Sequence, residues 1–144
     1  MKLFVLAAAA LSLTVAGVSA DPIEQRKKNM EERRDVLRII GPVAQGNADF
    51  DAAVVADALA RLDANARAAA DVEALWPEGS GSGDTKAAAA IWADFEGYKA
   101  ENVKYEQAVA TAAAAAPQDL AAFQAVFGPI GASCGSCHEN YRNK

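Results

Sequence analysis

Two cysteines and a histidine near the end of the chain have a spacing that allows covalent attachment of a cofactor. They lie in the segment Cys134-Gly135-Ser136-Cys137-His138, and His138 is the only histidine among the 144 residues. Cys-x-x-Cys-His is the attachment signature of a c-type haem, in which both thiols add to vinyl groups and the imidazole binds iron on the proximal side. On a helix these three side chains share one face and can project toward one flat macrocycle. The motif therefore predicts one covalent haem c, with thioether links at Cys134 and Cys137 and iron bound by His138.

Three other uses of the cysteine pair compete with haem attachment. A thioredoxin-like redox pair needs a strand and helix context that the surrounding sequence does not contain. A zinc site would have two thiolates and one imidazole, but the chain has no further cysteine or histidine to complete the usual four ligands. A structural disulfide would leave the adjacent histidine unexplained. Haem attachment is the interpretation that uses all three side chains.

The motif falls within the most regular apolar stripe of the chain. Its members step alternately by three and four residues: Leu120, Phe123, Phe127, Ile130, Cys134, Cys137 and Tyr141. That spacing predicts a helix over residues 117–142 with both cysteines on its buried side. Gly128, Pro129 and Gly131 disturb this helix, because proline costs ~3 kcal/mol and glycine up to ~1 kcal/mol relative to alanine in a helix interior. We expect a kink there, or a helix that restarts near Gly131.

The first helix of the chain is predicted over residues 22–40. Asp21 is a candidate N-cap, and Pro22 occupies the first helical position, where its missing N–H removes no helical hydrogen bond. Gly41-Pro42 is expected to end this helix, because glycine and proline together are a strong stop signal.

Two more helices are predicted between these. One covers residues 49–75, and the glycines and serines of residues 79–83 then predict a flexible loop. The next is capped by Asp84 or Thr85 and extends until Pro117 interrupts it. Four amphipathic helices joined by short connections predict an all-α protein with the architecture of an antiparallel four-helix bundle.

The N-terminus has the pattern of an export signal. A basic residue follows the initiator methionine, an apolar stretch comes next, and small residues precede an expected cleavage between Ala20 and Asp21. An uncleaved anchor helix is the alternative, but the apolar run is alanine-rich and short of the ~20 residues that a membrane span needs. We expect a leader over residues 1–20 and one domain over residues 21–144, located in the periplasm with no membrane span after cleavage.

The charge and composition exclude several classes of function. The formal net charge is −5 at pH 7, and removal of Lys2 with the leader would make the chain one unit more negative. An acidic protein is repelled by phosphate backbones and anionic headgroups, so we expect neither nucleic acid nor an anionic membrane surface as a partner. No acid and base pair, nucleophile constellation or phosphate loop is found, so the protein is not expected to be an enzyme.

The position of the motif near the C-terminus resembles the pattern of one known family, the cytochrome c prime family or class II c-type cytochromes. In mitochondrial-type cytochromes c the signature lies near the N-terminus instead. The further resemblances, in chain order, are the step from Arg26 to Met30, the Gly-rich loop, Ile91-Trp92, Gly131-Ala132-Ser133-Cys134 and Tyr141-Arg142. The resemblance covers the mature chain and implies a periplasmic haem protein of a kind that is often dimeric through its first two helices.

The resemblance makes the second axial position of the iron decisive for function. In low-spin members a methionine at the place of Met30 binds iron, whereas in high-spin members an apolar side chain there leaves the iron five-coordinate and screens a pocket for small gases. Met30 is the only methionine that remains once Met1 is removed. The chain therefore resembles the low-spin branch, in which a thioether ligand favours reduced iron and suits electron transfer. The alternative is that Met30 only fills the core, as methionine often does.

The resemblance also implies cationic partners for the haem propionates. Arg26 precedes Met30 by one helical turn, and Arg142 follows His138 by four residues. Arg26 is the candidate propionate partner that the family resemblance suggests, and Arg142 is a second candidate. The alternative for each is a solvated surface cation, because exposed ion pairs contribute only ~0–1 kcal/mol.

Three classes of function remain open at this stage. The first is a low-spin periplasmic electron carrier with His138 and Met30 as axial ligands and redox proteins of unknown identity as partners. The second is a high-spin protein that binds nitric oxide or carbon monoxide, with Met30 off the iron. The third is a cofactor-free helical interaction module, which would show no covalent haem on a denaturing gel. A homodimer is compatible with the sequence, since alanine-rich faces pack equally well within or between chains.

We predict that the double variant Cys134→Ala, Cys137→Ala accumulates poorly or unfolds. The alanine-rich bundle supplies little side-chain volume, so the haem would form much of its core. The yield of soluble protein and its thermal unfolding, followed by circular dichroism, measure this effect. A well-folded variant without haem that is as stable as the parent protein would contradict the prediction.

Overall fold

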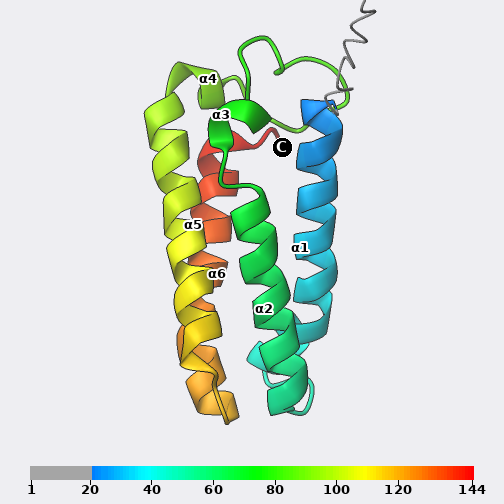
Figure 1. Cartoon of the computed structure of the whole chain (residues 1–144), viewed down its shortest axis with the longest axis vertical. Coiled ribbons are helices and arrows are strands. Elements are labelled where there is room, and N and C mark those ends of the chain that lie inside the picture. Colours follow the sequence, from blue (N-terminus) through cyan, green and yellow to red (C-terminus); the bar gives the residue numbers. More distant parts are fainter. Residues whose placement is uncertain (1–20) are drawn as a thin grey trace, which may run out of the picture.

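The structure, a computed structural model, describes residues 21–144, so the leader expected over residues 1–20 lies outside the described residues. Its helices are α1 (Pro22–Ala44), α2 (Ala52–Ala68), α3 (Val72–Leu75), α4 (Ala90–Ala93), α5 (Phe95–Ala115) and α6 (Leu120–Tyr141). The four long helices lie side by side, and the loop between α3 and α4 arches over the end of the bundle where α1 begins and α6 ends (Figure 1). The predicted all-α four-helix bundle is confirmed.

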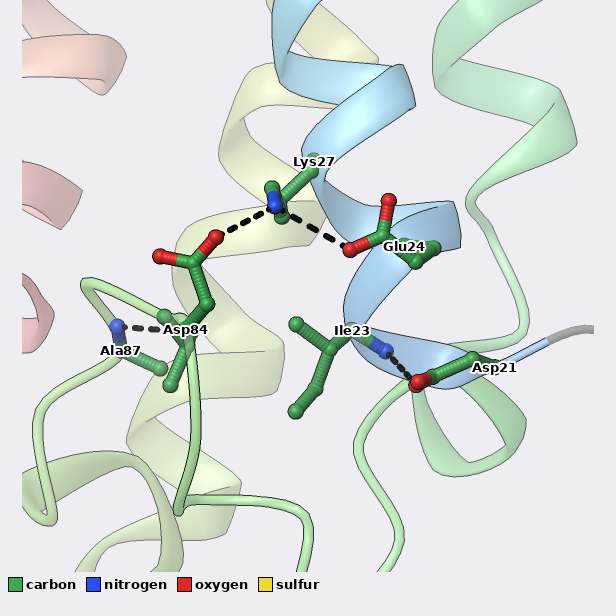
Figure 2. Close-up of polar contacts among 7 residues, drawn as sticks. Asp21, Ile23, Glu24, Lys27, Asp84 and Ala87 are labelled. Atoms are coloured by element: carbon green, nitrogen blue, oxygen red, sulfur yellow. Dashed lines mark hydrogen bonds and ion pairs between the residues drawn. The ribbon is translucent and has the colours of Figure 1, made fainter.

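Helix α1 begins as predicted and ends later than predicted. Asp21 caps it, because its side chain accepts a hydrogen bond of 2.8 Å from the backbone N–H of Ile23 (Figure 2). The expected end at Gly41-Pro42 is wrong, since the helix continues to Ala44 with Pro42 inside it. Pro42 lies in the last turn, where its missing N–H removes one hydrogen bond while its own carbonyl still accepts one of 2.8 Å from the N–H of Asn47.

The second and third predicted helices are each divided by an aspartate. Residues 69–71 separate α2 from α3, and Asp71 caps α3 by accepting a hydrogen bond of 3.0 Å from the N–H of Ala74. Asp94 separates α4 from α5 and accepts a hydrogen bond of 3.2 Å from the N–H of Gly97. A short acidic side chain offers the backbone an alternative to the helical hydrogen bond, so it starts a new helix instead of extending the old one.

The two caps expected for the third helix are also wrong. Asp84 forms an ion pair with Lys27 (Figure 2). Thr85 accepts a hydrogen bond of 3.1 Å from the N–H of Ala87 through its hydroxyl. Asp84 therefore holds the loop against α1, Thr85 bonds within the loop, and the helix begins only after it.

Helix α6 extends without interruption through Gly128, Pro129 and Gly131, so the expected restart near Gly131 is wrong. Phe123 and Ile130 on its inner face are 0% and 1% exposed. Burial of this face on both sides of the proline outweighs the local helix propensity, which is a weak determinant of structure. The start at Asp119 is a standard cap, in which the carboxylate accepts a hydrogen bond of 2.8 Å from the N–H of Ala122.

The core consists of two clusters of buried side chains that meet at the cysteines. The larger cluster joins the four long helices and includes Ile40, Leu59, Val109, Phe123 and Ile130. The smaller cluster, at the end covered by the loop, consists of Val72, Ile91, Tyr98 and Tyr141. Cys134 packs against the larger cluster and Cys137 against the smaller one. The expectation that the cysteines lie on the inner side of α6 is therefore confirmed.

Among the described helices, α6 alone is long and apolar enough to meet the length and composition criteria for a membrane span. The mean hydropathy of its most apolar 18-residue window is 1.2. Its large apolar side chains, however, lie in the two clusters of the bundle. We therefore attribute its hydropathy to core packing and to its many small residues.

We predict that Phe123→Ala lowers the free energy of unfolding by ~3–5 kcal/mol, because it removes a fully buried aromatic ring that packs against Phe50 and Phe127. Val103→Ala is the matched control, since Val103 on α5 is 46% exposed, and should cost less than ~0.5 kcal/mol. Urea denaturation of the two haem-loaded variants measures both values. Equal losses of stability would show that this cluster is not the core.

Candidate functional site

The sequence motif occupies the last two turns of α6. Cys134 and Cys137 are half-buried free thiols, and His138 is exposed. Burial raises the pKa of both thiols, and the nearby negative charge of Glu101 contributes to raising that of Cys137 to about 11. Both sulfurs are therefore protonated at neutral pH. A redox-active pair of the thioredoxin type instead requires a thiolate of lowered pKa, so the geometry does not favour that alternative.

The surroundings of His138 favour the neutral form of its imidazole. Its pKa is lowered by partial burial first, and then by the positive charges of Arg142 and Arg33. Neutral imidazole is the form that binds a metal through a ring nitrogen. No group of three or more histidine, cysteine, aspartate or glutamate side chains that could hold a metal ion occurs within residues 21–144.

Helix α1 presents Arg26, Met30 and Arg33 toward the same interior region. All three line a small cavity together with Trp76 from the segment after α3 and Tyr98 from α5. The ring of Tyr98 packs edge-on against that of Tyr141 at 5.3 Å, within the cluster that Cys137 contacts. Tyr98 therefore connects the cavity beside Met30 with the cysteine turn of α6. Met30 itself is 39% exposed.

Three buried polar atoms of this region have no hydrogen-bond partner within residues 21–144. They are Nε of Arg26, Oε2 of Glu101 and the hydroxyl of Tyr105. An unsatisfied buried donor or acceptor costs free energy, so such atoms indicate a bound group outside the polypeptide. Arg26 is only 6% exposed, and a carboxylate such as a haem propionate would satisfy its Nε. Two thiols, an imidazole, a thioether and a buried arginine fit the functional groups of a c-type haem.

Arg26 also holds the Gly-rich loop. Its Nη1 and Nη2 donate hydrogen bonds to the hydroxyl and the carbonyl of Ser80, at 3.1 and 2.8 Å, and its guanidinium lies 4.1 Å from the centre of the Trp76 ring. The interpretation of Arg26 as a solvated surface cation is therefore wrong. The loop predicted to be flexible is fixed further by Gly81, where any Cβ would approach the Trp92 ring to 2.8 Å. Glycine is required at that point of contact.

The neighbouring Lys27 fixes the far end of the same loop. Its ammonium group lies 2.8 Å from the carboxylate of Asp84 and 3.1 Å from that of Glu24 (Figure 2). Both carboxylates are well exposed, so this pair contributes little to stability and mainly orients the loop.

Arg142 does not join the group around Met30. It is exposed at the end of α6, where its backbone forms a bridge with Ala87. Its charge acts on His138, whose pKa it helps to lower. The structure thus brings Arg26 and Met30 together and leaves Arg142 on the surface beside the histidine.

Sequence reasoning did not identify Arg33 as a site residue. Its Nε donates a hydrogen bond of 2.7 Å to Oδ1 of Asn65, and its guanidinium lies 4.2 Å from the centre of the Tyr105 ring. Arg33 follows Arg26 by seven residues and Met30 by three, and this spacing places the three on one helix face. This spacing is the feature of the sequence from which Arg33 could have been identified as a site residue.

The comparisons with known proteins agree with this arrangement. A family model described as Cytochrome C′ matches residues 21–142. The chain belongs to the cytochrome c′ family. Among its relatives, a cytochrome c-556 of Agrobacterium fabrum is 33% identical, with 100% of this chain and 98% of the relative covered. A cytochrome c′ of Rhodospirillum rubrum is 32% identical, with 97% and 96% covered.

A solved structure of cytochrome c′ from Rhodopseudomonas palustris is similar to the chain in fold as well. Its TM-score is 0.78 at 31% identity, and the match covers 88% of this chain and 98% of that one. As a class II c-type cytochrome, the protein binds a covalently attached haem c and functions in electron transport. The family consists of electron-transfer and gas-binding cytochromes of the bacterial periplasm.

We predict that Arg26→Met releases the Gly-rich loop from the bundle. The substitution keeps an apolar stem against Trp76 but removes both hydrogen bonds to Ser80, each of the charge-assisted kind that contributes ~1.5–3 kcal/mol. Limited proteolysis within residues 79–83 should become faster, and the melting temperature should fall. Lys28→Met is the control, since Lys28 is exposed on α1 two residues after Arg26 and is not among the residues that bond to the loop. Unchanged proteolysis in the Arg26 variant would refute the role of this residue.

Proposed function

We propose that this cytochrome is a periplasmic electron carrier whose haem iron is bound by His138 on one side and by Met30 on the other. The observation that carries this proposal is the position of Met30. It lines the same cavity as Arg26 and Tyr98, and Tyr98 belongs to the cluster against which Cys137 packs. The proposed folded unit is residues 21–144, after removal of a leader over residues 1–20.

The haem iron supplies a one-electron redox couple when it is bound. The thioether of Met30 is a soft ligand that stabilises the reduced state. His138 would bind through its imidazole, whose pKa is lowered by partial burial and then by nearby cations, which favours the neutral, metal-binding form. His138 and Met30 would hold the iron from the protein in both oxidation states, and such a site would suit rapid electron transfer.

The remaining site residues attach and orient the haem. We assign the two thioether bonds to Cys134 and Cys137, and one propionate contact to Nε of Arg26, which is buried and has no partner within the described chain. Arg142 is the second propionate candidate. Its exposed position beside His138 would suit a propionate that reaches the surface.

The partners we propose are other redox proteins, and we propose no enzymatic reaction, nucleic acid or membrane span for the mature chain. The acidic surface charge is the basis for excluding nucleic acid. A homodimer through α1 and α2 is supported by two exposed apolar side chains on those helices, Ile39 and Val54, each 44% exposed.

A gas-binding function is the second candidate, and two observations favour it. Met30 is 39% exposed, more than the buried residues around it, and one relative is named cytochrome c′. In this alternative Met30 does not bind iron, and nitric oxide or carbon monoxide occupies the open position.

We predict that the purified protein has a low-spin absorption spectrum with the weak charge-transfer band of methionine bound to ferric haem. Met30→Ala removes the thioether, so this variant should lose that band, become high-spin and bind carbon monoxide readily. Ile39→Ala is the control, since Ile39 is exposed elsewhere on α1 and its loss should leave the spectrum unchanged.

A high-spin spectrum of the parent protein, together with ready binding of carbon monoxide, would contradict methionine ligation and establish the second candidate. A parent protein without covalent haem on a denaturing gel would contradict both candidates.

A further inference from the structure

Arg33 is fixed by neutral partners on the inner side of α1. Its Nε donates a hydrogen bond of 2.7 Å to Oδ1 of Asn65 on α2, and its guanidinium lies over the ring of Tyr105 on α5 at 4.2 Å. Cation–π contact with an aromatic face is attractive and leaves the charge of the cation in place. The described ion pairs do not include Arg33, so its positive charge is not neutralised by a carboxylate in direct contact.

Asn65 is itself immobilised, and it therefore fixes Arg33. It is 7% exposed, and its amide nitrogen donates to the carbonyl of Asn29 at 3.2 Å and to the carboxylate of Glu32 at 2.9 Å. The side chain of Asn29 donates in return to the carbonyl of Asn65 at 3.3 Å. These bonds orient the amide, so that its oxygen points to Arg33. They also tie α2 to the turn of α1 that carries Met30.

Arg33 lies beside the region where the haem would be held. It lines the cavity that Met30 and Tyr98 also line, and Tyr105, whose ring it covers, belongs to the buried cluster against which Cys134 packs. Its positive charge also acts to lower the pKa of Cys134, against the larger effect of burial. Arg33 is thus a fixed cation near Met30 and near the cluster that holds Cys134.

We propose that the positive charge of Arg33 raises the reduction potential of the haem. This inference rests on the proposed attachment of haem at Cys134 and Cys137. Oxidation removes one electron from the iron and adds one positive charge to the site, and a fixed cation nearby disfavours that added charge. Arg33 therefore favours the ferrous state.

The two inward-facing arginines of α1 have different roles in this proposal. Arg26 and Arg33 are seven residues apart, about 10 Å along a helix, with Met30 between them. Arg26 binds the loop at Ser80 and has a free buried donor for a propionate, whose negative charge would neutralise it. Arg33 keeps its charge, because an amide oxygen and an aromatic ring are its partners.

The test is a redox titration of the haem-loaded protein, followed by visible absorption, in Arg33→Gln and in the matched control Arg34→Gln. Both variants remove one positive charge from adjacent positions of α1, but Arg34 is exposed. At the midpoint potential of the parent protein, Arg33→Gln should shift the ratio of oxidised to reduced haem about tenfold toward the oxidised form, which corresponds to a midpoint about 59 mV lower. Arg34→Gln should shift the same ratio far less, and added salt should abolish the effect of this exposed substitution.

Two further variants keep the test decisive. Arg33→Met retains an apolar stem against Tyr105 and removes the charge, so it should lower the potential as Arg33→Gln does, whereas Arg33→Lys should stay close to the parent protein. If neither neutral variant loads haem, Arg33→Lys decides the test. A shift of about tenfold in its ratio of oxidised to reduced haem, toward the oxidised form, would overturn the proposal. A ratio close to that of the parent protein would support it.

Other outcomes overturn the inference directly. Equal shifts in Arg33→Gln and Arg34→Gln, or a higher potential in Arg33→Gln, would show that Arg33 does not tune the haem. Loss of the methionine charge-transfer band in both neutral variants also counts against the proposal, because this loss would show that Arg33 supports the binding of Met30 to iron instead. Failure of the proposed function is recognised separately, since the parent protein would then lack covalent haem or the band itself.

Discussion

The packing of α6 against α5 is the constraint on which the site depends. Tyr141 packs edge-on against Tyr98, and its hydroxyl donates a hydrogen bond of 2.8 Å to the carboxylate of Asp94. Further along the same helix, Ile130 is buried in the larger cluster. These contacts fix the rotation of α6 about its axis, so that the two cysteines face the interior while the next residue, His138, is exposed. A rotation of α6 by one residue would turn the thiols away from the two core clusters.

The polar groups of the interior form a second level of organisation. A bundle this rich in alanine has few large side chains, yet it buries an arginine, an asparagine, a glutamate and a serine: Arg26, Asn65, Glu101 and Ser133. Burial of such groups is costly unless they are satisfied. The amide nitrogen of Asn65 donates hydrogen bonds to Asn29 and Glu32, and the hydroxyl of Ser133 donates one to the carbonyl of Ile130. Arg26 and Glu101 keep one unpartnered atom each within the described residues, and we propose that the haem binds beside Arg26.

Much of this arrangement follows from local sequence patterns, and the remainder depends on contacts between distant residues. The Cys-x-x-Cys-His motif and the alternating steps of three and four predicted α6 and its inner face, because both signals repeat over many residues. The divisions at Asp71 and Asp94 each depend on one side chain that caps a new helix, and such single residues are weak signals in a window of helix formers. The site residues Arg33 and Asn65 come together only in the bundle, 32 positions apart, so no local pattern joins them.

The central claim is that the thioether of Met30 binds the iron of a haem attached to α6. Proton magnetic resonance of the ferrous protein tests it most directly, because the ring current of the haem displaces the methyl resonance of a bound methionine strongly upfield. Once the leader is removed Met30 is the only methionine, so the assignment has no competitor. We expect one such three-proton resonance in the parent protein and its disappearance in Met30→Ala. A ferrous protein with attached haem and no upfield methyl resonance would contradict it.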